Sequence, residues 1–247
     1  MRKIACVVFL ALLVAASLWG QAAPPKNPPA HPTTASTAAK PSLLDPASLK
    51  AKAPDVYRAK FTTTKGDFVV EVTRAWAPFG ADRFYNLVKY HFYDGASLFR
   101  IVPGFVAQFG IPAKPEIARV WANANIQDDP VMQSNLPGYV TYAQTAMPNS
   151  RNTQVFINYR DNSALDRQRF APFGKVVEGM DVVGKFYSGY GDNGPDQGRL
   201  TNEGRTYVDK SFPKLDSIKT AVIISPAPAA TPGSAAKPKP TAGTEKQ

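Results

Sequence analysis

Apolar and polar residues alternate along several short stretches of this chain, a pattern typical of β-strands that bury one face. Residues 57–64 and 67–73 alternate in this way and are rich in β-branched and aromatic side chains. Only Lys65 and Gly66 separate the two stretches, so a β-hairpin is expected. Six further strands are expected at residues 98–102, 105–109, 139–143, 153–158, 173–177 and 217–224.

Other stretches have the period of a helix or no period at all. Four residues recur at i, i+3, i+4 and i+7 and so share one helix face: Phe84, Leu87, Val88 and His91. We expect this helix over residues 81–91 and a second, short helix over residues 180–186. Short strands with two helices predict a mainly β fold, a closed antiparallel barrel capped by the helices. Residues 111–137 lack a clear period, and a loop of this length is usually functional or an insertion.

The N-terminus has the features of a secretory signal peptide. Arg2 and Lys3 supply a positive start, and residues 4–19 are almost entirely apolar. Gly20 and Ala22 then supply small side chains at the two positions that a signal peptidase reads. We therefore expect a signal peptide over residues 1–22, and its removal leaves no apolar run long enough to span a membrane. An uncleaved N-terminal anchor is the alternative.

Export follows from this interpretation, with the periplasm or the extracellular medium as the destination. The cysteine content neither supports nor opposes it, because the single cysteine, Cys6, leaves with the signal peptide. A mature chain without cysteine cannot form a disulfide in any compartment.

Both ends of the mature chain are rich in Ala, Pro, Ser and Thr. Residues 23–55 and 226–247 contain too few large apolar side chains to offset the entropy of ordering, so a disordered linker and a disordered tail are expected. They are either solvated ends or extended spacers that tether the protein to an envelope layer. One globular domain remains between them, over residues 56–225.

The charge distribution argues against a nucleic-acid partner. The whole chain carries a formal net charge of +10, but residues 56–225 contain 20 Lys and Arg against 16 Asp and Glu. No two basic residues are adjacent in this part of the chain. A nucleic-acid-binding protein would need a clustered basic face.

Common catalytic motifs are absent from the sequence. There is no G-x-S-x-G, H-E-x-x-H or C-x-x-C, and the only histidines are His31 in the expected linker and His91 on the expected helix. A hydrolase triad or a histidine-rich metal site is therefore hard to build. An activity of this chain must work without a nucleophile or a metal.

One arginine stands out in an otherwise apolar strand. Alternation places Arg100 and Val102 on the same face, and Pro103-Gly104 then reverses the chain. The charged side chain must reach water or a partner. On spacing alone, a salt bridge at the rim of the barrel explains it as well as a catalytic role.

Three blocks of the chain closely resemble the cyclophilin family. Residues 98–110 follow the pattern F-x-R-x-x-x-G-F-x-x-Q-x-G, with Leu98 in place of the first Phe. Residues 142–157 are similar to M-A-x-x-x-x-P-N-S followed by S-Q-F-F-I, and residues 165–180 to L-D-x-x-x-x-x-x-F-G-x-V-x-x-G-M. The resemblance covers residues 56–224.

This resemblance implies an eight-stranded antiparallel barrel capped by two helices, with the binding cleft on the outer face of the sheet. It implies peptidyl-prolyl cis–trans isomerase activity that needs no cofactor. Proline-containing peptides and unfolded exported proteins are the implied partners, and the protein is expected to be a monomer.

The resemblance also assigns roles by position in the blocks. Catalysis falls to Arg100, Phe105 and Gln108, with Arg100 donating to the prolyl nitrogen as the X-Pro bond twists. The substrate-binding residues carried over in the same way are Val106, Ala143, Gln154, Phe156, Leu165 and Phe170. For each apolar residue among them, ordinary packing in the barrel core is the alternative.

Some positions depart from the family pattern. Val106 stands where methionine is usual, and Phe170 where many relatives have histidine. Ala164 stands where many relatives carry an aromatic residue that binds cyclosporin, so weak cyclosporin binding is expected. These departures keep open a peptide-binding or chaperone module with little turnover. The Pro- and Ala-rich ends suggest a third possibility, an envelope scaffold.

Overall fold

The expected hairpin is present in the computed structural model, which describes residues 40–226. Residues 1–39 and 227–247 lie outside the described residues, and with them the expected signal peptide, part of the linker and nearly all of the tail. β1 (Val56–Thr63) and β2 (Gly66–Thr73) pair antiparallel, with Phe61 opposite Phe68. The two phenyl rings stack with their centroids 4.9 Å apart.

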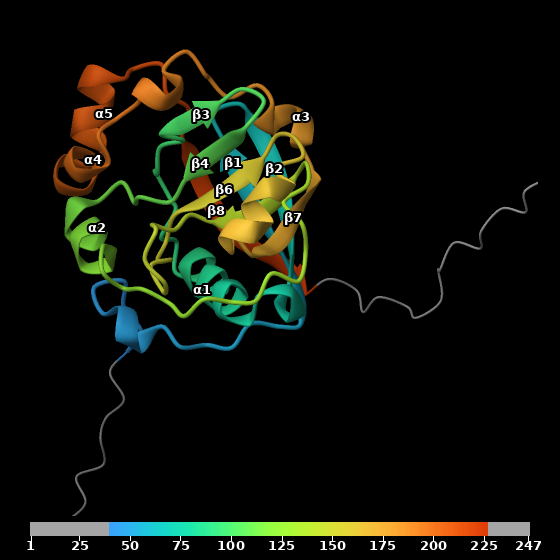
Figure 1. The fold of residues 1–247 in the computed structure, drawn as a ribbon. Coiled ribbons are helices and arrows are strands. Elements are labelled where there is room, and N and C mark those ends of the chain that lie inside the picture. Colours follow the sequence, from blue (N-terminus) through green and yellow to red (C-terminus); the bar gives the residue numbers. More distant parts are fainter. Residues whose placement is uncertain (1–39, 227–247) are drawn as a thin grey trace, which may run out of the picture. The chain divides into compact units, whose positions relative to one another are not determined.

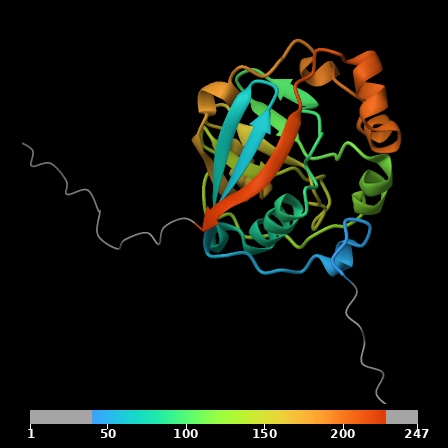
Figure 2. The ribbon, with the colours of Figure 1, turned by 180° about the vertical axis from the view of Figure 1, so that it is seen from behind.

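All eight strands belong to one antiparallel sheet, in the order β3-β4-β6-β5-β7-β2-β1-β8. The six strands after the hairpin lie where alternation predicted them: β3 (Arg100–Val102), β4 (Val106–Phe109), β5 (Tyr139–Tyr142), β6 (Val155–Asn158), β7 (Pro172–Glu178) and β8 (Ile218–Pro226). The sheet curls around a core covered at one end by α1 (Figure 1). Figure 2 shows from behind how β8 lies along the β1–β2 hairpin.

The expectation of a closed barrel is wrong, because the sheet is a curled half-barrel with β3 and β8 as its two edges. Among the described residues, the two edges meet only at the isolated bridge between Ser97 and Ser217 and through the backbone hydrogen bonds beside it. β3 is only three residues long, and the backbone hydrogen bonds to Ile218 at the start of β8 are formed by Gly95 and Ala96, which precede β3. No ladder therefore closes the seam.

Helix α1 (Pro78–Lys89) confirms the helix predicted from periodic apolar residues. Phe84, Leu87 and Val88 are fully buried in the core, as their shared face predicts. His91, expected on the same face, lies beyond the helix with φ 59 and an exposed side chain, because the helix has already ended.

The fold contains more helices than the two expected caps. α3 (Met180–Val183) falls inside the expected second helix, but α2 (Pro115–Trp121), α4 (Gln197–Glu203) and α5 (Arg205–Ser211) were not expected. Each of these three is seven residues long, too short for a clear period in the sequence. They lie together on one side of the sheet (Figure 1).

Ordered structure begins before the expected domain boundary at Val56. Trp121 Nε1 donates to the carbonyl oxygen of Leu43 at 2.7 Å, and the backbone N–H of Ala53 donates to Asp82 Oδ1 at 2.8 Å. Residues 40–55, expected to be part of the linker, thus belong to the folded part, because their backbone groups find partners on α1 and α2.

Candidate active site

Alternation along the strands divides the side chains between a core and an outer face. On β4, Ala107 and Phe109 belong to the main hydrophobic core, whereas Val106 and Gln108 line a cavity outside it. On β6, Phe156 lines the same cavity, and its two neighbours in the strand belong to the core. Successive side chains of a strand point to opposite faces, so this cavity lies on the outer face of the sheet, where the cleft was expected.

The cavity has a volume of about 180 Å³. It brings together eight of the nine predicted site residues with one residue, Gln144, that was not predicted. Its wall consists of Arg100, Phe105, Val106, Gln108, Ala143, Gln144, Phe156, Leu165 and Phe170. Gln154, the ninth predicted residue, lines a neighbouring hollow and accepts a hydrogen bond from Gln108.

Arg100 is fixed at the edge of the cavity by two hydrogen bonds. Its Nη1 donates to Gln108 Oε1 at 3.1 Å, and its Nε donates to Asp192 Oδ1 at 2.6 Å. Its guanidinium carbon lies 5.6 Å from the centre of the Phe105 ring, close enough for a cation–π interaction. Nη2 has no hydrogen-bond partner among residues 40–226. Arg100 therefore forms the rim salt bridge considered above and also presents a donor beside the cavity.

The apolar part of the cavity has the character of a small binding pocket. Val106 and Phe156 are nearly buried, and the ring of Phe170 meets that of Phe156 edge to face at 5.7 Å. Within the described chain, neither hydrophobic cluster of buried residues includes Phe105, Phe156 or Phe170. Packing in the barrel core, the alternative for these side chains, therefore does not account for their position.

Two glutamines extend the polar side of the site. Gln108 Nε2 donates to Gln154 Oε1 at 2.9 Å, and Gln154 Nε2 donates to Gln197 Oε1 at 3.0 Å. Gly110, directly after β4, lies close to the chain that leads into β6, because a Cβ atom there would clash with the carbonyl oxygen of Thr153. Its φ of 122° lies in the left-handed region, so the backbone conformation favours glycine as well.

The cleft continues beyond the cavity into two neighbouring hollows. Gln144 lines the cavity and also two neighbouring hollows of about 490 and 290 Å³. Its Nε2 donates to the carbonyl oxygen of Gln168 at 2.7 Å, while its buried Oε1 has no partner in the described part of the chain. The backbone N–H of Ala143 donates to the carbonyl oxygen of Gln154 at 2.9 Å. The site therefore has room for a peptide longer than one residue.

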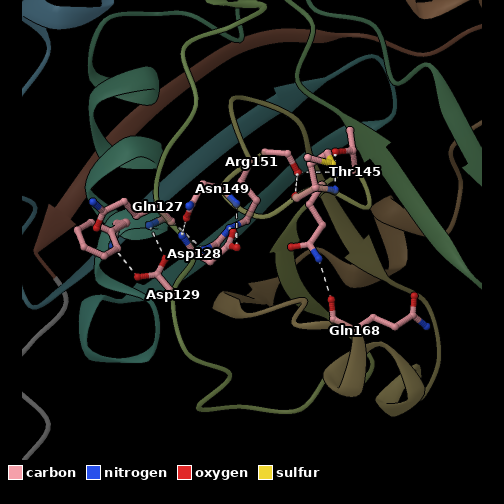
Figure 3. Close-up of polar contacts among 12 residues, drawn as sticks. Gln127, Asp128, Asp129, Thr145, Asn149, Arg151 and Gln168 are labelled. Carbon is pink, nitrogen blue, oxygen red and sulfur yellow. Dashed lines mark hydrogen bonds and ion pairs between the residues drawn. The ribbon is translucent and has the colours of Figure 1, made fainter. Parts of the chain in front are cut away.

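A buried ion-pair network supports the loop that carries this side of the cleft (Figure 3). Arg151 is fully buried, and its guanidinium contacts Asp128 at 3.1 Å, Asp129 at 3.4 Å and the carbonyl oxygen of Gln127 at 2.8 Å. Asp129 also accepts hydrogen bonds at 2.9 Å from two backbone N–H groups at the start of α1. Burial raises the pKa of Asp129, and these donors and Arg151 act in the opposite direction.

A second polar network holds the other wall. The carboxylate of Asp166 accepts from the backbone N–H and Nδ2 of Asn135 at 3.0 and 2.7 Å. Asn135 Nδ2 also donates to the carbonyl oxygen of Phe170 at 2.9 Å. These contacts fix the loop that carries Leu165 and Phe170. Asn135 lies in the stretch over residues 111–137 that had no expected role.

Several residues that shape the site were not identified from the sequence. Asp192 and Gln197 contact predicted site residues, but neither lies in the three blocks, and no spacing connects them with Arg100. The adjacent acids Asp128 and Asp129 gave a weak signal, because charged neighbours in a loop usually face solvent.

Within residues 40–226, no cluster of three or more His, Cys, Asp or Glu could hold a metal ion. None of the described helices is long and apolar enough to cross a membrane.

Comparison with known proteins agrees with this geometry. Residues 58–203 match the family model described as cyclophilin type peptidyl-prolyl cis-trans isomerase/CLD. A peptidyl-prolyl cis-trans isomerase of Acinetobacter baylyi is 33% identical over 139 residues, which cover 50% of this chain and 68% of the relative. Peptidyl-prolyl cis-trans isomerase B of Escherichia coli is 29% identical over 179 residues, 67% of this chain and 98% of the relative.

A likeness at the level of the fold extends to solved structures. The crystal structure of a cyclophilin type peptidyl-prolyl cis-trans isomerase of Cryptosporidium parvum superposes with a TM-score of 0.50 at 19% identity. The match covers 69% of this chain and 98% of that chain. On the match to the family model and on these relatives, the chain belongs to the cyclophilin-type peptidyl-prolyl cis-trans isomerase family.

Proposed function

We propose that the outer-face cleft isomerises X-Pro peptide bonds of exported polypeptides, with Arg100 as the catalytic residue. Peptidyl-prolyl isomerisation is the activity of the family. One observation carries the assignment to this site: the guanidinium of Arg100 is held beside an apolar cavity with Nη2 unpaired among the described residues. The cavity is the proposed site of the proline ring.

The chemistry of the bond explains why an arginine suffices. Resonance stiffens the C–N bond of the peptide, and rotation faces a barrier of roughly 18–20 kcal/mol. As the bond twists, resonance is lost and the lone pair returns to the prolyl nitrogen, which becomes a hydrogen-bond acceptor. A donor from Arg100 would then bind the transition state more strongly than the planar ground state. Such a difference in binding lowers the barrier.

The surroundings of Arg100 support this role. Val106, Phe156 and Phe170 give the cavity an apolar lining, and electrostatic interactions are stronger beside apolar surface than in water. Gln108 fixes the guanidinium, and the Phe105 ring lies against it without competing for its donors. A preorganised donor needs little rearrangement when the bond twists.

A proline-containing peptide is the proposed ligand. The Cryptosporidium parvum cyclophilin has also been crystallised in the presence of the dipeptide Ala-Pro. In the present chain, the two hollows that Gln144 also lines could hold residues next to the proline. The N-terminal pattern of residues 1–22 supports export, and unfolded exported proteins are therefore the proposed clients.

Refolding of a protein whose slow phase is limited by proline isomerisation tests this function. The mature chain should accelerate that phase at catalytic concentrations, since uncatalysed isomerisation takes roughly tens to hundreds of seconds. Acceleration only at stoichiometric concentrations would support a binding or chaperone module instead. No acceleration, either of refolding or of a short peptide, would contradict the proposed function.

A further inference from the structure

The helices α4 and α5, with the turn Gly191–Asn193 before them, form an insert between α3 and β8, which we call the helical insert (residues 187–215). The helical insert has its own small hydrophobic cluster. The buried residues of this cluster are Phe99, Ile111, Ala118, Leu200, Tyr207 and Val208. Leu200, Tyr207 and Val208 belong to the insert, and the other three lie outside it. One of these, Phe99, directly precedes Arg100, so the insert packs beside the start of β3 (Figure 1).

The start of the insert approaches β3 very closely. A Cβ atom at Gly194 would lie 2.5 Å from the carbonyl oxygen of Phe99, the residue just before Arg100. Only glycine allows this contact without a backbone shift. The close approach places Asp192 next to the predicted catalytic arginine, although 92 positions separate the two residues in the sequence.

Two connections run from the insert to Arg100. The first is direct, because Asp192 Oδ1 accepts from Nε at 2.6 Å. The second starts at Gln197 Oε1, which accepts from Gln154; Gln154 in turn accepts from Gln108. Gln108 then accepts from Arg100 Nη1. Asp192 and Gln197 lie in the same insert, so the hydrogen bonds form a circuit that begins and ends on it.

We propose that Asp192 and Gln197 are positioning residues that hold the guanidinium of Arg100 in its working orientation, an inference that rests on the proposed function. A free arginine side chain samples many rotamers. With Nε and Nη1 both engaged, the guanidinium plane is fixed and Nη2 remains as the donor for the twisted X-Pro bond. Small errors in the placement of a catalytic group can cost a large part of its effect.

Four variants separate this role from general stabilisation. Asp192→Ala removes the acceptor, and Asp192→Asn keeps an acceptor oxygen without the charge. Gln197→Ala breaks the indirect connection. Asp209→Asn is the matched control, because Asp209 accepts from Arg205 Nε at 2.6 Å in the same insert and contacts no residue of the cavity. Thermal unfolding shows whether each variant is folded.

The two readouts are turnover of an X-Pro peptide by NMR exchange and the Nε–H resonance of Arg100. Asp192 is exposed, and exposed ion pairs contribute modestly, so Asp192→Ala should lower kcat about three- to fivefold with little change in peptide affinity. Asp192→Asn should retain most of the activity, and Gln197→Ala should cost about twofold. The Arg100 Nε–H resonance should shift and exchange faster with water in Asp192→Ala only.

The outcomes distinguish this inference from the proposed function. If the wild type is active and Asp192→Ala matches the Asp209→Asn control, the inference is wrong and the function stands. An increase in activity would also overturn it, because Asp192 would then compete with the substrate for Arg100. If the wild type itself is inactive, the proposed function fails and the inference fails with it.

Discussion

Arg100 and Gln108 lie directly opposite each other in the β3–β4 ladder, and Nη1 of the arginine donates to Oε1 of the glutamine at 3.1 Å. Phe156 is the next residue across the sheet, opposite Gln108 in the β4–β6 ladder. A donor, its support and an apolar floor thus occupy one row across three strands. Strand register, which alternation largely determines, therefore assembles the centre of the site.

Gln108→Leu should lower turnover of an X-Pro peptide about tenfold, because one hydrogen bond to a charged group is lost from Arg100. The nearly buried position and similar volume should leave the fold intact. NMR exchange of the peptide, with urea unfolding as the check on stability, measures both. Gln108→Glu is the companion variant, since it keeps an acceptor for Nη1, and it should retain more activity than Gln108→Leu. Equal activity in wild type and Gln108→Leu would contradict this role.

Arg151→Met should lower the free energy of unfolding by about 3 kcal/mol, because it leaves the buried carboxylate of Asp129 without its cation. Urea unfolding followed by tryptophan fluorescence measures the change. Asp181→Asn is the control, because its pair with Lys185 is exposed, and it should show no clear change in stability. A stability of Arg151→Met equal to that of the control would show that the network in Figure 3 contributes little.

Tyr159 should make stability depend on alkaline pH. Burial raises the pKa of Tyr159 to about 12, and its hydroxyl donates to the carbonyl oxygen of Val183 at 2.8 Å. The folded-state pKa lies above the ordinary value of 10.0, so this stabilisation is complete below pH 10 and is lost as the pH rises toward 12. Tyr159→Phe should therefore be less stable at pH 8 and should lose less stability than wild type between pH 10 and pH 12. Parallel curves for the two proteins would contradict the assignment.

Ala164→Trp should increase affinity for cyclosporin about tenfold without lowering turnover. Ala164 is exposed in the turn Ser163–Gln168 beside the cavity wall, so an indole there has space and could bury apolar surface of the ligand. Inhibition of peptide isomerisation by cyclosporin, compared between wild type and variant, measures the change. Strong inhibition of the wild type would show that Ala164 does not limit cyclosporin binding.

The strands were predictable because each buries one face and therefore alternates. The cavity residues were predictable for a different reason, the resemblance of three blocks to a family, since periodicity alone left Arg100 as a possible rim salt bridge. The short helices α4 and α5 give too few turns for a period, and their packing depends on Phe99 and Ile111 far away in the sequence. The contact between Arg100 and Asp192 depends on that packing, so no local pattern could predict it.

The open seam of the sheet has a similar explanation. The number and order of strands along the chain followed from alternation, but closure depends on whether β3 and β8 are long enough to pair. β3 has only three residues, and the two edges of the sheet meet instead at the isolated bridge between Ser97, before β3, and Ser217, before β8. Residues 40–55 were expected to be disordered on composition, yet a few specific contacts with Trp121 and Asp82 hold them.

The central claim is that Arg100 lowers the barrier to rotation of the X-Pro bond. Protease-free NMR exchange of a short X-Pro peptide, with the mature wild type and Arg100→Ala, tests it most directly. The wild type should accelerate exchange, and the variant should lose most of the acceleration, on the order of 10²-fold, while remaining folded and still binding the peptide. An Arg100→Ala variant that accelerates exchange as well as the wild type would contradict the account.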